Sequence, residues 1–531
     1  MRKIKVLSFF LLIYLISFSQ NKSQGNQPAK RKTPERSYGF RSELIRGPYL
    51  QMATSHSMMI RWRTDLNDIS VVRYGTSDNN LDKIVKDITS VTEHIVTITD
   101  LQPGTKYYYL IESAGDTLQN EDDNYFMTLP LVGKEGLYRI GVFGDCGDKS
   151  ANQRNVRDHF VKYLGNNYLN AWILLGDNAY GYGKDAEFQA NFFDRYTTKL
   201  LRKYPLFPAP GNHDYHDEEF SAELARKQAH FAYYQSFSMP VNGEAGGVPS
   251  NTQAFYSFDI GNIYFLSLDS HGEQDNNSRM SDTLGRQARW VKEDLEANKN
   301  KGWIIAYWHH PPYSMGSHNS DEQDELVNIR KNFIPILERY GVDLVLCGHS
   351  HDYERSKLMK GHFGPEATFN AAKYNLSSSS GMYNGSKNSC PYIKDSTNQG
   401  TVYVVSGSAG MVSYKQASFP HAALPYSNAS YGGSVMLEIQ GNRLDLKWIC
   451  SDGVIRDLFT MMKNVNKRMI VEVKKGDTAI LTASFVGKYQ WNKSNEHSRS
   501  IRVSPPVGIS VFTVQDPENC LKDIFEVMVS N

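Results

Sequence analysis

Five stretches of this chain end an apolar run with a cluster of polar side chains, and no other feature limits the fold as strongly. The clusters are "FGDCGD" (143–148), "GDNAY" (176–180), "APGNHDY" (209–215), "AYWHH" (306–310) and "CGHSH" (347–351). Buried strands that end in polar residues are typical of α/β domains, which collect ligands at the carboxyl ends of their strands. Helix-like stretches at 186–203 and 284–298 lie between the runs. We therefore predict an α/β domain whose five clusters meet at the same edge of one sheet.

The clusters supply oxygen and nitrogen donors and require no thiolate. The donors are Asp145, Asp177 with Tyr180, Asn212 with His213, His309 with His310, and His349 with His351. Any one of these pieces alone is an ordinary turn or an ordinary histidine, but five in succession after apolar strands indicate a metal site. Mixed imidazole and carboxylate donors suit zinc, iron or manganese rather than calcium or magnesium alone. We expect Cys146 and Cys347 to be small buried residues beside the metals.

Together the clusters resemble the five blocks of metallophosphoesterases of the purple acid phosphatase type, within the calcineurin-like superfamily. Those blocks run GDx, GDxxY, GNH(E/D), VxxH and GHxH, and here Ala306 replaces the usual valine. The resemblance spans residues 46–460. It implies a catalytic domain at 136–460, built as an α/β core of two packed mixed β-sheets flanked by helices.

One position separates the branches of this superfamily. Many metallophosphoesterases begin with Asp-x-His, where the histidine binds the first metal, but this chain has Gly147 there. The purple branch supplies Tyr180 instead. A free phenol has a pKa near 10, so a phenolate ligand at neutral pH favours ferric iron. The alternative is that Tyr180 is only a packing aromatic.

The resemblance also implies which residues hold each metal. The first metal takes Asp145, Asp177, Tyr180 and His351; the second shares Asp177 and takes Asn212, His309 and His349. We expect Fe(III) with a divalent zinc, iron or manganese. His310 is expected to face away and at most to support a ligand. Asp148 and Tyr353 are candidates for the same supporting role, on position alone.

The implied reaction is hydrolysis of a phosphate monoester by in-line attack of a metal-bound hydroxide, with a phosphorylated small molecule as substrate. Two metals about 3.5–4 Å apart bind phosphate oxygens and activate a shared water. His213 is the candidate to steady the transition state or protonate the leaving oxygen. His318 matches a histidine that plant-like members direct at the phosphate, although an exposed loop histidine is the alternative. A phosphodiesterase or nucleotidase on the same scaffold, and a surface binding protein with a vestigial catalytic domain, remain open.

The two flanking regions are predicted to be all-β. Short strands at regular spacing in 44–130 indicate a β-sandwich, and "LQPGTKYYYL" (101–110) resembles the corner of fibronectin type III-like modules, with Tyr107 after the turn. Residues 466–531 are strand-like again and resemble an Ig-like module. That module is a candidate for contact with the cell surface or an extracellular partner.

The N-terminus predicts export. Three basic residues precede the apolar run "VLSFFLLIYLI" (6–16), which is too short to span a membrane, so we read a signal peptide at 1–19 and a linker at 20–43. The protein is then secreted, periplasmic or at the cell surface, with no membrane span.

Charge and cysteine content add two expectations. A net charge of +1, from 58 basic and 57 acidic residues, gives no support for nucleic-acid binding. The five cysteines have irregular spacing, and a Cys390–Cys450 bridge is possible, for geometry to decide.

Overall fold

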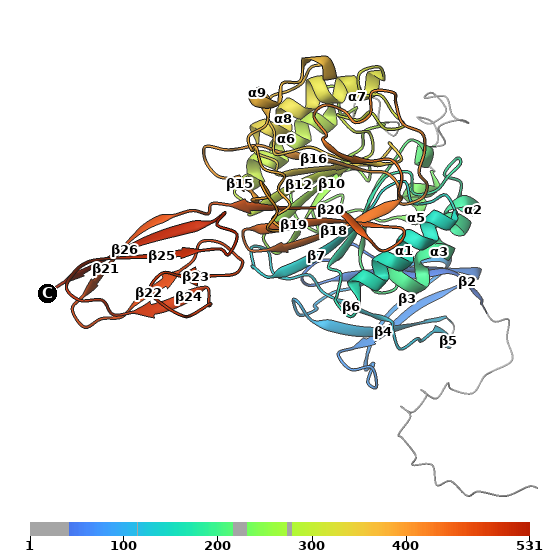
Figure 1. Ribbon diagram of the computed structural model, residues 1–531. Helices are drawn as coiled ribbons and strands as arrows, with labels where there is room; N and C mark the ends of the chain where they lie inside the picture. Colours follow the sequence, from blue (N-terminus) through green and yellow to red (C-terminus); the bar gives the residue numbers. More distant parts are fainter. Residues whose placement is uncertain (1–41, 114, 216–230, 273–278) are drawn as a thin grey trace, which may run out of the picture. The chain divides into compact units, whose positions relative to one another are not determined.

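The structure is a computed structural model that describes residues 42–531 apart from 114, 216–230 and 273–278 (Figure 1). The predicted signal peptide at 1–19 and all but the last two residues of the linker at 20–43 lie outside the described residues. Among the helices that the structure describes, none combines the length and the apolar character needed to cross a membrane.

The catalytic region is built on two mixed β-sheets. The first contains β15 (Tyr392–Lys394), β20 (Ile455–Lys463), β19 (Arg443–Cys450), β18 (Gly433–Gln440), β7 (Leu137–Phe143), β8 (Ala171–Leu175) and β9 (Leu206–Ala209), in that order. The second contains β10 (Tyr256–Ile260), β11 (Ile263–Ser267), β12 (Trp303–Trp308), β13 (Leu344–Cys347), β16 (Val402–Ser406), β14 (Tyr353–Arg355) and β17 (Tyr426–Asn428). The predicted core of two mixed sheets is thus confirmed.

The sheets pack face to face through aromatic side chains. The rings of Phe207 and Phe258 stack with centroids 3.9 Å apart, and the hydroxyl of Tyr307 donates to the carbonyl of Phe207 at 3.1 Å. This packing brings the carboxyl ends of β7, β8 and β9 near those of β12 and β13. The prediction that all five clusters lie on one sheet is therefore wrong. A fully apolar run shows that a strand is buried on both faces, but it does not show which strand is its neighbour.

Helices cover both sheets. They are α1 (Ala151–Leu164), α2 (Asp185–Glu187), α3 (Asp194–Tyr196), α5 (Ala232–Ser236), α6 (Arg286–Asn298), α7 (Asp324–Asn328), α8 (Ile334–Arg339) and α9 (Ala371–Tyr374). α1 begins at Ser150, whose side chain accepts from the Gln153 N–H at 2.9 Å, and it contacts β18 and β19. α6 lies against the second sheet, where Asp294 accepts from the Tyr264 hydroxyl at 2.6 Å. Both predicted helical stretches are present; the helical segment Phe188–Phe193 joins α2 to α3, and Thr197–Leu201 continues the run after α3.

The N-terminal strands extend the first core sheet. They are β1 (Leu44–Gln51), β2 (Met58–Gly75), β3 (Lys83–Ile98), β4 (Lys106–Ser113), β5 (Asp116–Gln119) and β6 (Tyr125–Met127). The first half of β2 pairs with β1 and its second half with β4, while β1 meets β9 at Gln51 and Leu206. After the Pro-Gly turn, the Tyr107 hydroxyl accepts from the Gln102 N–H at 2.9 Å.

The C-terminal strands form two smaller sheets around their own apolar cluster. β21 (Arg468–Lys474), β26 (Lys522–Ser530), β25 (Gly508–Gln515) and β23 (Gln490–Trp491) form one; β22 (Ala479–Thr482) and β24 (Ser500–Val503) form the other. Leu481, Phe485, Val514 and Val527 are fully buried in that cluster. We call residues 466–531 the C-terminal module below.

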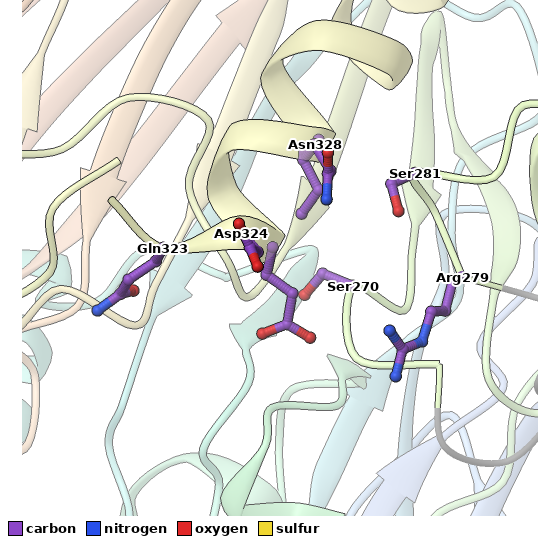
Figure 2. A pocket seen from close by; sticks show the side chains of 8 residues that line it. Ser270, Arg279, Ser281, Gln323, Asp324 and Asn328 are labelled. Atoms are coloured by element: carbon purple, nitrogen blue, oxygen red, sulfur yellow. The ribbon is translucent and has the colours of Figure 1, made fainter. Parts of the chain in front are cut away.

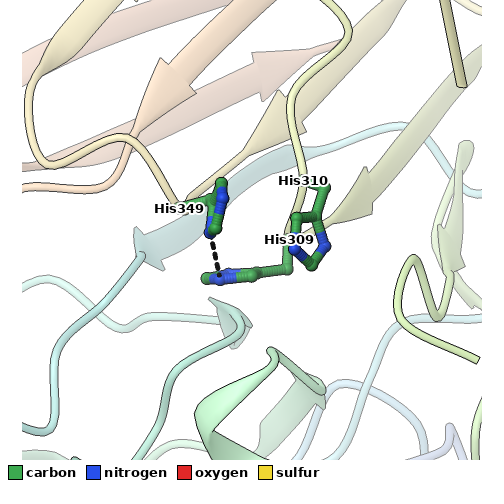
Figure 3. Close-up of side chains that lie close together, drawn as sticks. All are labelled: His309, His310 and His349. Carbon is green, nitrogen blue, oxygen red and sulfur yellow. Dashed lines mark hydrogen bonds between the residues drawn. The ribbon is translucent and has the colours of Figure 1, made fainter. Parts of the chain in front are cut away.

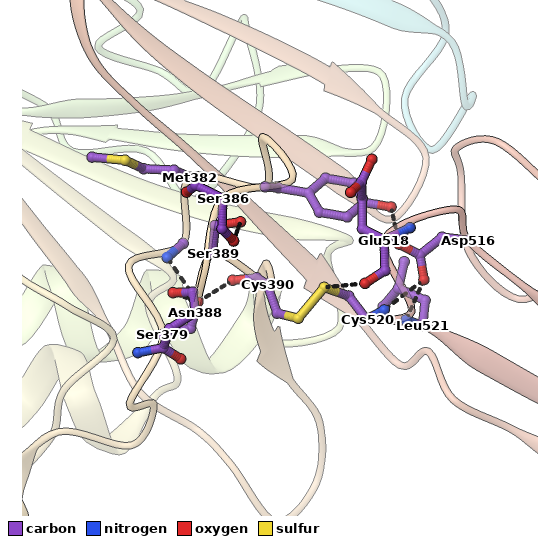
Figure 4. The surroundings of a disulfide bond; sticks show 12 residues. Ser379, Met382, Ser386, Asn388, Ser389, Cys390, Asp516, Glu518, Cys520 and Leu521 are labelled. Atoms are coloured by element: carbon purple, nitrogen blue, oxygen red, sulfur yellow. Dashed lines mark hydrogen bonds between the residues drawn. A yellow bond between two sulfur atoms is a disulfide. The ribbon is translucent and has the colours of Figure 1, made fainter.

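A disulfide joins the catalytic region to the C-terminal module. It links Cys390, two residues before β15, to Cys520 in the turn between β25 and β26, with a Cα–Cα distance of 5.3 Å (Figure 4). Beside it, the hydroxyl of Tyr383 donates to Asp516 at 3.0 Å. The Cys390–Cys450 bridge considered above is therefore wrong. Cys450 is buried at the end of β19 as a free thiol, and sequence spacing carries no information on such distances.

We expect Cys520→Ala to lower the free energy of unfolding by about 2–4 kcal/mol, because the bridge closes a long loop in the unfolded chain. The two cysteines are 130 residues apart. Urea denaturation followed by tryptophan fluorescence measures the change. Dithiothreitol should lower the stability of the wild type to that of the variant and leave the variant unchanged. A wild type insensitive to reduction would contradict this prediction.

Candidate metal centre

The first group of predicted ligands meets around the imidazole of His309. Its Nε2 lies 3.0 Å from the Asn212 side-chain oxygen, 3.3 Å from a carboxylate oxygen of Asp177 and 3.2 Å from Nδ1 of His349. Figure 3 shows the contact between the two histidines. These donors come from the ends of β8, β9, β12 and β13, and so from both sheets.

The second group meets around the hydroxyl of Tyr180. That hydroxyl lies 3.1 Å from a carboxylate oxygen of Asp145 and 2.9 Å from Nε2 of His351. The same carboxylate oxygen and imidazole nitrogen are 3.5 Å apart. Donor atoms of Asp145, Asp177 and His309 all lie within 4.8 Å of one another, so the two groups adjoin. The structure thus brings the seven predicted ligands together in two adjoining groups.

The tautomer of His309 fits a metal ligand. Its Nδ1 lies 2.8 Å from the carbonyl oxygen of Leu175, which only accepts, so Nδ1 carries a proton and Nε2 is the nitrogen that a metal ion would bind in place of a proton. Burial would lower the pKa of His309, but the carboxylates of Asp177 and Asp145 outweigh it and raise the pKa to about 10. The cluster therefore attracts positive charge. This attraction for positive charge, together with the mixed nitrogen and oxygen donors, fits a cation of the zinc, iron or manganese class.

Three of the predicted ligands have left-handed backbone conformations. The φ angles are 56° at Asp145, 50° at Asp177 and 68° at His349. This region costs a non-glycine residue about 1–3 kcal/mol and is concentrated at functional sites. Each of these residues directly follows a glycine at the end of a strand. The strained turns therefore aim the side chains at the site.

Gly147 is fixed by a close backbone contact. A β-carbon at this position would lie 1.8 Å from the carbonyl oxygen of Asn178 and 2.8 Å from Cα of Ala179. The carbonyl of Gly147 also accepts from the N–H of Tyr180 at 2.8 Å. A histidine at position 147 would displace the turn that carries Tyr180. The structure thus explains why the chain has a glycine in one position and a tyrosine in the other.

Asp214 supports the site in a way that the motif alone did not reveal. Its buried carboxylate accepts from the N–H of Asn178 at 3.1 Å, the Asn178 side-chain amide at 2.8 Å and the N–H of Gly211 at 2.8 Å. It thereby ties the loop after β8 to the loop after β9. Burial, together with the charge of Asp177, raises the pKa of Asp214 to about 7. Asp214 is the last residue of the GNH(E/D) block, so the sequence marked its position, but it did not show that Asp214 joins the two loops.

The two predicted catalytic histidines lie on different sides of the site. His213 is partly exposed; its Nδ1 contacts the carbonyl of Gly181 at 2.6 Å and its Nε2 lies 3.9 Å from Asp177. The ring of His318 stacks on that of His349 with centroids 3.6 Å apart. Burial lowers the pKa of His318 to about 4, so it is neutral at physiological pH. The structure thus brings both histidines to the predicted ligands.

His310 has hydrogen-bond partners of its own, but its ring stays near the cluster, with its centroid 4.2 Å from that of His349. The rings of His309 and His310 are 5.0 Å apart and nearly perpendicular, at 85°. Nδ1 of His310 contacts the hydroxyl of Ser270 at 2.8 Å, and its Nε2 lies 3.5 Å from Glu325. Burial lowers its pKa to about 3. Adjacent residues on an extended segment point in different directions, which accounts for the divergence.

The remaining candidates have structural contacts. Asp148 accepts from the N–H of Ser150 at 3.0 Å, at the start of α1. The hydroxyl of Tyr353 donates to Asp457 at 2.8 Å. These contacts hold a helix start and a sheet rather than a predicted ligand.

Cys146 and Cys347 are buried free thiols, and burial raises the pKa of both, so they are protonated.

Two family models match the chain. Residues 138–353 match the calcineurin-like phosphoesterase family, and residues 46–128 match the purple acid phosphatase N-terminal domain. The first match contains all seven predicted ligands. The second covers strands β1 to β6, apart from the first two residues of β1.

Curated relatives and solved structures agree with these matches. Purple acid phosphatase 23 of Arabidopsis thaliana is 30% identical over 292 residues, which are 50% of this chain and 58% of the relative. Acid phosphatase type 7 of Homo sapiens is 25% identical over 400 residues, which are 71% of this chain and 78% of the relative. The chain thus spans less than two thirds of the plant relative. The structure of purple acid phosphatase PPD1 from yellow lupin (Lupinus luteus) seeds superposes with a TM-score of 0.58 at 16% identity, covering 80% of this chain and 74% of that one. At this identity the superposition supports the fold alone.

Proposed function

We propose that the protein is a metal-dependent phosphatase of phosphate monoesters, from the premise that residues 138–353 match the calcineurin-like phosphoesterases and residues 46–128 match the purple acid phosphatase N-terminal domain. The observation that carries the proposal is the convergence of seven donors in two adjoining groups. When bound, a pair of metal ions polarises phosphate oxygens and lowers the pKa of a water toward neutrality, for in-line attack on phosphorus.

The proposed ligands divide as the contacts do. Asp145, Tyr180 and His351 hold one ion, Asn212, His309 and His349 hold the other, and Asp177 contributes to both. A tyrosine ligand favours Fe(III) at the first position, with a divalent zinc, iron or manganese at the second. His309 is kept in the metal-binding tautomer by the carbonyl of Leu175.

His213 and His318 are proposed to act on the substrate. His213 lies at the partly exposed edge of the site, where its Nε2 can reach a leaving-group oxygen and supply a proton. His318, neutral and stacked on His349, is placed to hydrogen-bond a phosphate oxygen. Neither role requires a protein nucleophile.

Paired substrates test the proposal against its nearest alternative. The purified full chain should hydrolyse p-nitrophenyl phosphate at least tenfold faster, as kcat/KM, than bis(p-nitrophenyl) phosphate. Chelation should abolish the activity, and Fe and Zn together should restore it. Faster turnover of the diester would replace the monoesterase with a phosphodiesterase. No hydrolysis of either ester by metal-loaded protein would leave a binding protein with a vestigial catalytic domain.

We also propose that the protein is exported. The sequence of residues 1–19 predicts a signal peptide, and disulfides such as Cys390–Cys520 form and persist in oxidising compartments. Contact with the cell surface through the C-terminal module belongs to the same proposal. Cell fractionation of the native host tests the location. Recovery of activity in the cytoplasm with both cysteines reduced would contradict export.

A further inference from the structure

A second cluster of metal-binding side chains lies next to the proposed dinuclear centre. His271 and His310 follow the parallel neighbours β11 and β12, and Glu325 lies at the start of α7. Donor atoms of the three residues all lie within 4.8 Å of one another. Two of these residues, His271 and Glu325, have no part in the ligand sets proposed above. The third, His310, adjoins them, because donor atoms of His309, His310 and His349 also lie within 4.8 Å of one another.

The nitrogen–oxygen distances within this cluster are longer than typical hydrogen bonds and close to the distances between ligands of a shared cation. One carboxylate oxygen of Glu325 lies 3.5 Å from Nε2 of His310, and the other lies 3.7 Å from Nδ1 of His271. Hydrogen bonds between nitrogen and oxygen are typically about 2.7–3.2 Å long. Ligands at about 2.0–2.2 Å from a tetrahedral zinc ion are themselves roughly 3.3–3.6 Å apart. The 3.5 Å separation falls within this second range, and the 3.7 Å separation lies just beyond it.

Hydrogen bonds outside the cluster hold the two histidines in place. A carboxylate oxygen of Asp269 accepts from the N–H groups of His271 and Gly272, both at 2.9 Å. The N–H of His310 donates to the Ser270 hydroxyl oxygen at 3.0 Å, and Nδ1 of His310 lies 2.8 Å from the same oxygen. If Nδ1–H donates to Ser270, Nε2 presents its lone pair toward Glu325. Such an outer hydrogen bond is the usual support of a metal-bound histidine.

One member of the cluster, Glu325, also lines a cavity. The cavity has a volume of about 410 Å³, and its walls include Ser270, Arg279, Gln323, Glu325 and Asn328 (Figure 2). Three protein ligands with one position open to a cavity are the arrangement of exchangeable zinc sites. The side chain of Glu325 is 40% exposed, so an ion can reach the carboxylate.

We propose that His271, His310 and Glu325 bind a third divalent cation of the zinc class. The site adjoins the proposed dinuclear centre, because the ring centroids of His310 and His349 are 4.2 Å apart. Its open position faces the cavity and accepts an oxygen donor, such as water or a phosphate oxygen. The competing explanation is a metal-free network in which Glu325 links two neutral histidines.

Counting ions per chain separates the two explanations. Wild-type full chain and variants are saturated with Zn²⁺, gel-filtered, and analysed for zinc and iron by plasma mass spectrometry. Glu325→Gln and His271→Gln should each hold one ion fewer than the wild type. Asp324→Asn, on the neighbouring residue of the same cavity, should hold the wild-type number. Equal counts in the wild type and both cluster variants would overturn the proposal.

A structural measurement keeps the test decisive if the variants fold poorly. An anomalous difference map at the zinc edge, from wild-type crystals grown with Zn²⁺, should show a peak between the three side chains. The absence of that peak, with peaks present at the dinuclear centre, overturns the third site and leaves the proposed function intact. Conversely, peaks absent from the dinuclear centre contradict the proposed function whatever the third site shows.

Discussion

Replacing Asp177 by asparagine is expected to remove at least one metal ion per chain and to lower kcat/KM for p-nitrophenyl phosphate by about 10³-fold. Asp177 is the donor proposed to serve both ions, and its carboxylate lies 3.3 Å from Nε2 of His309. Its other oxygen accepts from the N–H of His213 at 3.0 Å, so the change also loosens a proposed catalytic residue. Lewis-acid catalysis supplies several kcal/mol, and each 1.4 kcal/mol is tenfold in rate, which gives the expected magnitude of about 10³.

The control for this variant is Asp82→Asn, which makes the same chemical change at an exposed position of the N-terminal region. It should retain the metals and the activity of the wild type. An Asp177→Asn protein that keeps its full metal content and activity would show that the cluster around His309 is not the metal centre.

Replacing Gly147 by alanine is expected to lower the free energy of unfolding by about 1–3 kcal/mol, the usual cost of overpacking. The added β-carbon would lie 1.8 Å from the carbonyl oxygen of Asn178, which is backbone and can yield only if the whole turn moves. That turn carries both Asp177 and Tyr180. A displacement of about 1 Å at a reacting centre costs roughly 10²-fold in rate, so we expect an activity loss of that order.

Thermal or urea denaturation and steady-state kinetics measure the two effects of Gly147→Ala. The matched control is Gly487→Ala in the C-terminal module, where an added β-carbon meets no heavy atom closer than 3.7 Å. It should change neither stability nor activity appreciably. If Gly147→Ala kept wild-type stability and metal content, the contact between the first two motif loops would not constrain the site.

The predicted ligands could be found from sequence because each motif encodes a local turn. A glycine followed by a donor at the end of a buried strand specifies a sharp turn, and the strained φ angles of Asp145, Asp177 and His349 are its physical form. Four of the five motifs have such a glycine, and "AYWHH" (306–310) does not; the division of the donors into two sets came from the resemblance of all five motifs to the family. The divergence of His309 and His310 followed from the alternation of an extended chain.

Features that depend on long-range packing could not be read in the same way. Apolar runs did not show that the clusters come from two sheets, since burial on both faces looks the same in either arrangement. The partner of Cys390 depended on where the turn containing Cys520 meets the catalytic region. The cluster of His271, His310 and Glu325 has no motif, because its members follow two different strands and begin a separate helix.

We propose that Tyr180 and six further donors hold a dinuclear centre with ferric iron. The most direct test is the metal content and visible spectrum of the purified full chain beside those of Tyr180→Phe. We predict iron together with a second metal, and a broad visible absorption band that the variant loses, since the band would arise from the bond between tyrosinate and iron. Divalent metals without colour, or a band that survives in Tyr180→Phe, would contradict the claim.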